Sequence, residues 1–418
     1  MSLCSIKMCI FANRTYKSKQ FINMKDFNFY APTQVVFGKE SEEKVAALVK
    51  KYGGTKVLVH YGGGSAKRSG LLDKLFGLLS EAGIPYVELG GVVPNPLLSK
   101  VKEGIELCRK EGVDFILAVG GGSVIDSSKA IGYGVCYDGD PWDFWGKGVA
   151  PKACLPIGAV LTIPAAGSEM SNSCVITRDE DKNKRGFNSD LCRCKFAILN
   201  PERTFTLPPY QTAAGATDIM MHTMERYFTP EQDMTLTDAI AEALLKTVKD
   251  CALEVMKNPE DYRNRAQIMW AGSLAHNDLT ECGTTKDFAT HRLEHELSAL
   301  FGVTHGAGLA AIWPSWARYC IQKGHARRFA QFAVNVMGVT NDFTDVERTA
   351  LKGVEAIEQF YRQIGMPTCI SELLGKTATE EEIEHMAKMC SRGYSITVGS
   401  LEVLGPEEMK VIYRMANR

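Results

Sequence analysis

The first half of the chain alternates short apolar runs, rich in β-branched residues, with longer stretches in which apolar positions recur at helical spacing. Alternation of this kind is typical of a parallel sheet whose strands are joined by crossover helices. Residues 24–208 are therefore predicted to form a Rossmann-like α/β domain. The predicted strands cover 56–60, 86–89, 114–119, 157–163 and 195–199, and the predicted helices cover 41–52, 65–82, 97–111 and 123–131.

From about residue 209 the strand pattern disappears and helical periodicity fills the rest of the chain. Residues 209–418 are predicted to form a second, all-helical domain. Its predicted helices cover 212–227, 236–256, 262–279, 286–301, 306–322, 326–336, 346–363, 380–391 and 406–416.

Two local patterns interrupt the first half. The charged segment 176–187, ITRDEDKNKRGF, predicts a hairpin that carries Lys182, Lys184 and Arg185. The aromatic segment DPWDFW, residues 140–145, is interpreted as a packed lid or a contact between the domains, in preference to a binding motif.

Length and charge narrow the class of protein. The 418 residues are too many for one hydrophobic core, which agrees with two domains. Lys and Arg number 48 against 49 Asp and Glu, without a block of like charge, so neither nucleic acid nor a membrane surface is indicated as a partner. No run approaches the roughly 18 apolar residues of a membrane-spanning helix. A small-molecule substrate fits this composition best.

The 13 cysteines and the N-terminal residues bear on the compartment. The cysteines are odd in number and scattered without a CxxC pair, which favours a reducing compartment and hence the cytoplasm. Residues 1–23 are basic and contain no acidic residue. They are interpreted as a disordered extension or as the result of a start codon set too early; a transit peptide is the alternative.

Two glycine clusters directly follow predicted strands. HYGGGS places Gly62, Gly63 and Ser65 at one strand end, and AVGGGS places Gly121 and Gly122 at another. Glycine lets backbone N–H groups approach a phosphate closely, and the N-terminus of the following helix favours negative charge. Neither cluster is the GxGxxG fingerprint, but two at successive strand ends predict a dinucleotide cofactor.

The first cluster also indicates which dinucleotide binds. Enzymes that prefer NAD usually carry an acidic residue at this point to bind the ribose 2′-hydroxyl. Here Ser65, Lys67 and Arg68 follow the turn instead. Hydroxyl and cationic groups suit a 2′-phosphate, so NADP(H) is the predicted cofactor.

A crowding of histidines predicts a metal site. His291 and His295 lie four residues apart on one helical face, and His305 follows after a break that contains a glycine. Upstream, Asp218 and His222 also lie four apart on a predicted helix. One carboxylate with several imidazoles suits a borderline divalent metal. The hypothesis is a metal held by Asp218, His222 and two of the three later histidines, and spacing does not decide which two.

Several motifs together resemble one family. They are FYAPTQVVFGK, HYGGGS, VVPNP, AVGGGSVIDSSKAI, TIPAAGSEMS, TLPPYQTAAGATDIMMHTMERYF and THRLEHELSALFGVTHGAGLA. The chain from residue 24 to its end resembles the iron-dependent (group III) alcohol dehydrogenases, and within them the NADPH-dependent butanol dehydrogenase and aldehyde reductase branch. The resemblance implies a dehydroquinate synthase-like architecture, a homodimer, and interconversion of primary alcohols and aldehydes.

The resemblance also implies roles for individual residues. Its metal ligands correspond to Asp218, His222, His291 and His305, with iron(II) expected and zinc(II) possible. His295 is then the histidine that faces the substrate and handles a proton. The implied cofactor-binding residues are Gly62, Gly63, Ser65, Asn95, Gly121, Gly122, Ser123, Asp126, Thr162 and Lys184.

One position departs from the family pattern, and two other functions are weighed. Where the family usually has threonine before GSE, this chain has Ala166, so a hydrogen bond of about 0.5–1.5 kcal/mol to the cofactor is expected to be missing. A glycerol dehydrogenase-like or other polyol dehydrogenase is the alternative enzyme, because it shares the fold. A non-catalytic nucleotide-binding relative is the alternative from another class.

Overall fold

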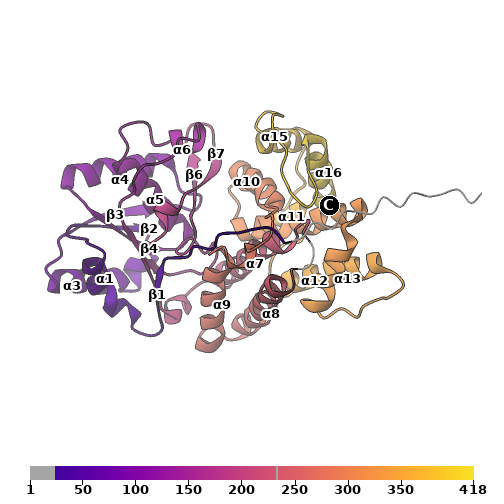
Figure 1. Cartoon of the computed structure of the whole chain (residues 1–418), viewed down its shortest axis with the longest axis horizontal. Helices are drawn as coiled ribbons and strands as arrows, with labels where there is room; N and C mark the ends of the chain where they lie inside the picture. The colour runs from indigo at the N-terminus through magenta and orange to yellow at the C-terminus, as the bar shows by residue number, and fades with distance from the viewer. Residues whose placement is uncertain (1–23, 232–233) are drawn as a thin grey trace, which may run out of the picture.

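The computed structural model describes residues 24–231 and 234–418, which form an α/β domain followed by a helical domain (Figure 1). The hypotheses for residues 1–23 lie outside the described residues. In the described part of the chain, no helix has both the length and the apolar character needed to span a bilayer.

The α/β domain is built on a six-stranded, fully parallel sheet of order β1-β8-β5-β4-β2-β3. Its inner strands are buried apolar runs, as expected for a sheet covered by helices on both faces. All five predicted strands are confirmed; β1, whose run is short, was missed. The strands are β1 (Gln34–Phe37), β2 (Val57–Gly62), β3 (Tyr86–Val92), β4 (Phe115–Gly120), β5 (Ile157–Leu161) and β8 (Phe196–Leu199).

The strand order reverses between β2 and β4. The chain passes from β2 outward to β3 and then returns to β4 on the other side of β2. In an open parallel sheet, ligands bind beyond the carboxyl ends of the strands at such a reversal. Both glycine clusters follow the two strands that flank it, which places them at the expected ligand-binding edge.

Helices in this domain follow the predicted pattern with one break. The helix predicted over 65–82 is interrupted, because Gly70 adopts a left-handed conformation with φ of 71°. Gly70 is tolerated there since it has no Cβ. The helices of this domain are η1 (Ser41–Lys44), α1 (Val45–Lys51), α2 (Ser65–Arg68), α3 (Leu71–Glu81), α4 (Leu98–Glu111), α5 (Gly122–Val135), α6 (Asp143–Gly146), η2 (Asp190–Cys192) and η3 (Pro201–Thr204).

The predicted hairpin is confirmed, and the aromatic segment DPWDFW is packed against it. Strands β6 (Ser173–Arg178) and β7 (Asn183–Asn188) pair antiparallel, apart from the main sheet. Trp142, Phe144 and Trp145 are buried within the α/β domain, where the rings of Phe144 and Trp145 lie 6.1 and 6.3 Å from that of Phe187 on β7. The segment therefore packs against strand β7 of the hairpin.

The helical domain packs around α7, which is buried along nearly its whole length. Pro209 at the first turn suits a helix start, because its missing N–H has no partner there. One predicted helix, 262–279, ends earlier, at Ala275, and Asp278 beyond it is left-handed. The helices are α7 (Pro209–Tyr227), α8 (Thr235–Lys257), α9 (Tyr262–Ala275), η4 (Leu279–Glu281), α10 (Ala289–Phe301), α11 (His305–Cys320), η5 (Ile321–His325), α12 (Ala326–Asn335), α13 (Val346–Gln363), α14 (Ile370–Leu374), α15 (Glu380–Cys390) and α16 (Pro406–Ala416).

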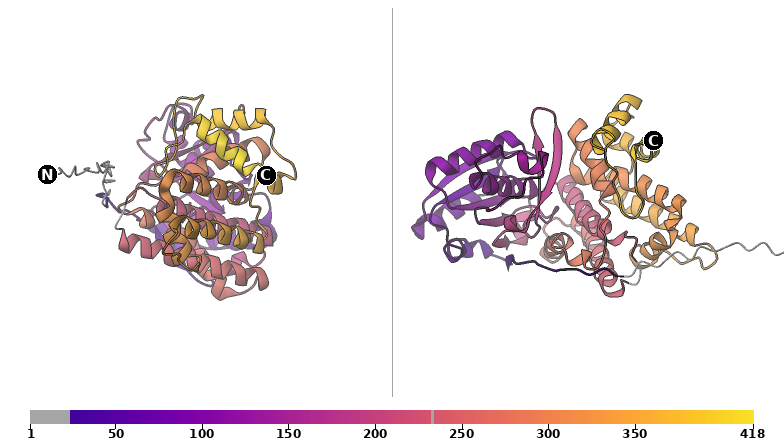
Figure 2. Two further views of the ribbon diagram at one scale, coloured as in Figure 1. Left: turned by 90° about the vertical axis from the view of Figure 1, so that its right-hand side faces the viewer. Right: turned by 45° about the horizontal axis from the view of Figure 1, so that its top comes forward.

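The two domains sit side by side, with the hairpin β6–β7 standing at their junction beside α10 (Figure 2). The segment before β1 runs across both domains, and its Lys25 N–H donates to the carbonyl of Gly283 at 3.0 Å. Lys184 on β7 reaches across the junction and donates to Ser298 Oγ on α10 at 3.1 Å. The domain junction is therefore where residues from both halves of the sequence meet.

Candidate active site at the domain junction

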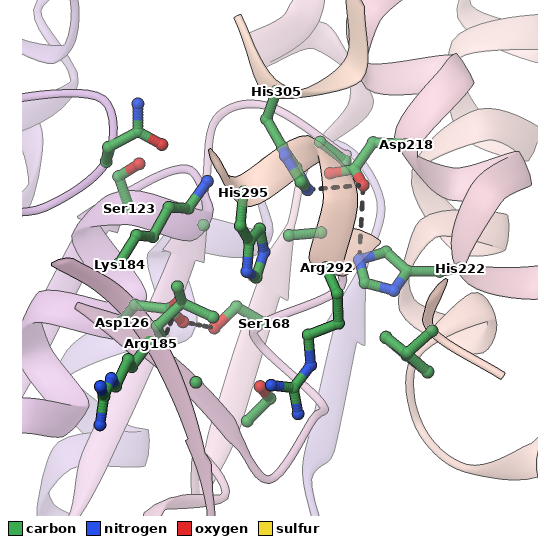
Figure 3. A pocket seen from close by; sticks show the side chains of 18 of the residues that line it. Ser123, Asp126, Ser168, Lys184, Arg185, Asp218, His222, Arg292, His295 and His305 are labelled. Atoms are coloured by element: carbon green, nitrogen blue, oxygen red, sulfur yellow. Dashed lines mark hydrogen bonds and ion pairs between the residues drawn. The ribbon is translucent and has the colours of Figure 1, made fainter. Parts of the chain in front are cut away.

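A cavity of about 1000 Å³ opens between the domains. The α/β domain contributes the turn after β4, the loop before β6 and strand β7, and the helical domain contributes α7, α10 and the start of α11. Ligand sites commonly occupy such junctions. Figure 3 shows side chains from both domains pointing into this space.

Four polar side chains converge on one point of the cavity wall. Asp218 Oδ1 lies 3.4 Å from His222 Nε2, 3.7 Å from His291 Nε2 and 3.8 Å from His305 Nε2. Asp218 and His222 share a face of α7, His291 comes from α10, and His305 is the first residue of α11. The predicted break before His305 is a turn at Gly302, whose φ is 68°. Figure 3 shows the contacts of Asp218 with His222 and His305.

The chemistry of these atoms fits a divalent cation. Asp218 Oδ1 and His291 Nε2 are buried, and neither has a hydrogen-bond partner in the described residues. Buried polar atoms are normally paired, so unpaired atoms that face one another point to a bound ion. One carboxylate and three imidazoles form a donor set suited to iron(II) or zinc(II).

Two buried carboxylates, Glu225 and Glu294, hold the imidazole rings from behind. Glu225 Oε1 accepts from both the backbone N–H and the Nδ1–H of His291, each at 2.9 Å. Glu294 Oε2 makes a short contact with His305 Nδ1. A carboxylate on one ring nitrogen fixes the tautomer and turns the other nitrogen toward the ion. Sequence reasoning missed both residues; their only signal is an acid three residues after His222 and after His291.

Electrostatics in the cluster depend on those carboxylates. Burial alone would lower the pKa of His291, but the negative charge of Asp218 and the hydrogen bond with Glu225 outweigh it and raise that pKa to about 9. A cation that binds Nε2 must therefore displace a proton.

His295 differs from the other histidines. It lines the cavity, with its ring 6.4 Å from that of His291 and 5.6 Å from that of His305. With Glu294 and His305 it forms a second group of potential ligand atoms. Burial, reinforced by the charge of Lys184, holds the pKa of His295 well below its usual range, so its ring is neutral at neutral pH.

A further histidine, missed in the sequence, supports His222. The ring of His276 stacks on that of His222 at 4.1 Å between centroids. His276 Nδ1 lies 2.7 Å from the carbonyl oxygen of Ala166, and since a carbonyl only accepts, Nδ1 carries the proton. Ala166 thus contributes to the site through its backbone carbonyl group, although its side chain lacks the hydroxyl group of a threonine.

The structure brings together six of the ten predicted cofactor residues. Gly121 also has a packing role, because a Cβ there would lie 2.2 Å from Ile163 Cγ2. The other four, Gly62, Gly63, Ser65 and Thr162, do not line the cavity; Gly62 pairs with Val92, which does. The six that line it are Asn95, Gly121, Gly122, Ser123, Asp126 and Lys184.

A buried hydrogen-bond network fixes the loop beside the glycine turn. Asp126 accepts hydrogen bonds from Ser168 Oγ at 2.5 Å and from Val175 N at 2.9 Å. Lys129, fully buried one helical turn later, donates to the carbonyls of Ser168 and Ser173 at 2.7 and 2.8 Å. Asp126 therefore has partners within the protein, and Lys129 is a supporting residue that sequence reasoning missed.

Comparison with known proteins agrees with this architecture. The family model for iron-containing alcohol dehydrogenase matches residues 32–201, and the model for the C-terminal part of the Fe-containing alcohol dehydrogenase family matches residues 212–416. The chain is 41% identical over 394 residues to NADH-dependent butanol dehydrogenase A of Clostridium acetobutylicum, covering 94% of this chain and 99% of that protein. It is 37% identical to NADPH-dependent aldehyde reductase YqhD of Escherichia coli, covering 84% and 89%.

Solved structures extend the likeness to three dimensions. The crystal structure of NADH-dependent butanol dehydrogenase A from Thermotoga maritima superposes with a TM-score of 0.90 at 36% identity, covering 95% of this chain and 100% of that one. Both family models and these relatives span the α/β and the helical domain, which together enclose the cavity. The chain therefore belongs to the iron-containing alcohol dehydrogenase family.

Proposed function

We propose that this protein interconverts primary alcohols and aldehydes of the butanol and butanal type by hydride transfer with a nicotinamide dinucleotide. The observation that carries the proposal is the convergence, in one cavity, of the Asp218 cluster and the glycine turn after β4. Relatives at 37–41% identity are named butanol dehydrogenases and an aldehyde reductase, which supports the same reaction.

The proposed metal ligands are Asp218, His222, His291 and His305, with iron(II) expected and zinc(II) possible. When bound, the ion supplies Lewis-acid polarisation of the substrate oxygen. Support for His291 over His295 comes from the bond between its Nδ1 and Glu225, which directs Nε2 toward Asp218.

His295 is proposed to pass a proton to the developing alkoxide. A general acid must be within reach of the oxygen and able to exchange its proton. Because its pKa is held low, His295 is neutral and acts as a relay to water and not as a stored acid.

NADP(H) is the proposed cofactor, although the relatives include both NADH- and NADPH-dependent enzymes. The cationic residues after β2 support it: a Cβ on Gly64 would lie 2.6 Å from Arg68 Nη1, so the guanidinium folds back over the turn. We expect NADPH to give the higher kcat/KM and Arg68→Ala to reduce that preference. A higher kcat/KM with NADH would contradict the assignment.

The decisive assay follows the nicotinamide absorbance during reduction of butanal by protein loaded with iron(II) or zinc(II), with metal content measured in parallel. We expect turnover that depends on the metal and falls after treatment with a chelator. Protein that carries the metal and both cofactors yet reduces no short or medium aldehyde would refute the proposal.

We further propose that the enzyme acts as a homodimer in the cytoplasm. The eleven cysteines in the described residues are all free, which suits a reducing compartment. Light scattering coupled to size-exclusion chromatography measures the assembly state, and a monomeric mass would contradict the first part.

A further inference from the structure

Three arginines line the cavity without a carboxylate partner. Arg185 lies on β7, Arg292 on α10, and Arg392 follows α15. Within residues 24–231 and 234–418, none of the three forms an ion pair, and the only side-chain hydrogen bond is from Arg185 Nε to the neutral Asn183 Oδ1 at 2.9 Å. Three cationic groups therefore face one cavity, and none of them has a carboxylate in direct contact among the described residues.

Two buried arginines elsewhere have carboxylate partners, whereas Arg185 is half-buried and Arg292 and Arg392 are exposed. Arg193 pairs with Asp190 at 2.7 Å, and Arg226 pairs with Glu281 at 3.0 Å. Burial, and then the charge of Arg392, lower the pKa of the Arg185 guanidinium. The repulsion between these two cations is a cost that a bound anion would relieve.

The remaining charged groups of the cavity do not fill this role. Lys286 is paired with Glu281 at 3.0 Å, and Asp287 accepts from the backbone N–H groups of Ser400 and Leu401. Glu296 lies near the arginines, but burial raises its pKa to about 7 against the opposing charges of Lys184 and Arg185. Its carboxyl therefore loses its proton less readily than an ordinary glutamate, and it forms no direct ion pair with the arginines among the described residues.

The position of the arginines separates them from the glycine turn. In Figure 3, Arg185 and Arg292 lie below His295, whereas Ser123 lies above and to the left of it. Arg292 is adjacent in sequence to His291 and leaves the same helix beside the metal-facing residues. An anion here would lie next to the substrate end of the cavity and away from the turn expected to hold the pyrophosphate.

We propose that Arg185, Arg292 and Arg392 form a subsite for a carboxylate or similar oxyanion at the far end of an aldehyde substrate. This subsite rests on the proposed function and narrows its substrate class to aldehydes with a terminal acidic group. Guanidinium groups suit carboxylates because their planar N–H pairs match both oxygens. The reaction is unchanged: hydride goes from the reduced nicotinamide to the carbonyl carbon, a proton goes to its oxygen, and the carboxylate stays intact.

The test compares aldehydes of equal length with and without a terminal carboxylate: succinic semialdehyde against butanal, and glutaric semialdehyde against pentanal. We expect the metal-loaded enzyme to have a higher kcat/KM for the carboxylated member of at least one pair. The ratio between the two members should fall about tenfold or more in Arg292→Gln, the loss expected for one charged hydrogen-bond partner. Arg263→Gln, an exposed arginine on α9 outside the cavity, is the matched control and should keep the wild-type ratio.

Binding measurements distinguish the source of the anion. Calorimetric titration with succinic semialdehyde should show weaker binding to Arg292→Gln than to wild type, while the Kd for NADH and NADPH should stay within about twofold. If Arg185→Gln, Arg292→Gln and Arg392→Gln weaken dinucleotide binding and leave the substrate ratio unchanged, the anion is a cofactor phosphate and the subsite is refuted. Turnover of butanal with no advantage for either acidic aldehyde refutes the subsite alone. Absence of turnover for every aldehyde refutes the proposed function, and the calorimetric comparison then decides the subsite.

Discussion

Replacing Glu225 by glutamine should weaken metal binding without touching a metal ligand. Glu225 Oε1 accepts two hydrogen bonds from His291, one from the backbone and one from Nδ1, both at 2.9 Å. Both side chains are buried, with exposures of 2% and 3%. Glutamine keeps the shape and an acceptor oxygen but removes the negative charge that makes the His291 ring a stronger donor to a cation.

The expected size of the effect follows from that contact. Loss of a carboxylate behind a ligating histidine typically weakens metal affinity about 10- to 100-fold, which is about 1.4–2.8 kcal/mol. Competition with protons reduces this difference at neutral pH. Glu225 helps raise the pKa of His291 to about 9, so a metal ion that binds the wild-type protein at neutral pH must first displace a proton from His291. The loss should therefore be largest at a pH near that pKa and smaller at neutral pH.

Competition with a calibrated chelator gives the dissociation constant for zinc(II) at both pH values, and thermal unfolding of the metal-free proteins checks that the fold is retained. Glu254→Gln is the matched control, since Glu254 is an exposed residue of α8 paired with Lys257 at 2.7 Å. Equal zinc affinity in Glu225→Gln and wild type at the higher pH would refute the reasoning that this carboxylate supports the metal centre.

Four further substitutions test other parts of the structure. His291→Ala should lose both the metal and turnover, whereas His295→Ala should keep the metal by elemental analysis and turn over more slowly; loss of metal in His295→Ala would make it a ligand. Lys129→Met leaves the buried carbonyl oxygens of Ser168 and Ser173 without their donor, so the free energy of unfolding should fall by about 1–3 kcal/mol, and a denaturation midpoint equal to wild type would contradict the role of that network. Burial lowers the pKa of His60 to about 4, so the unfolded chain binds the extra proton between about 6.5 and 4 and stability should fall by up to about 3 kcal/mol as pH drops through that window. His60→Gln should flatten this part of the pH profile of the unfolding free energy; an unchanged slope would show that another group titrates.

Local patterns predicted most of the secondary structure because helix and strand periodicity depends on neighbours in the sequence. They failed where a boundary depended on backbone conformation or tertiary contact. The helix predicted over 65–82 breaks at the left-handed Gly70, and the one predicted over 262–279 ends at Ala275, beyond which His276 bonds to Ala166. The aromatic segment 140–145 was recognised as packed, but only the fold identifies its neighbour.

Some residues of the candidate site were also predicted from the sequence, and others were not. Spacing and family resemblance together predicted Asp218, His222, His291 and His305. The fold places the Nε2 atoms of the three histidines within 3.8 Å of Asp218 Oδ1. It did not predict Glu225, because its contact with His291 joins positions 66 residues apart.

The sequence by itself determined the ingredients: glycines after two strands, an aspartate and a histidine on one face of α7, and two histidines on one face of α10. The glycine turns and the helical faces depend only on residues that are close together in the sequence, so they can be predicted without the tertiary structure. Only the tertiary structure decided that His291 Nε2 turns toward Asp218, because the carboxylate that orients its ring comes from another helix. It also decided that Arg292 faces the cavity and forms no ion pair with any described residue, since an ion pair depends on every chain segment that passes nearby.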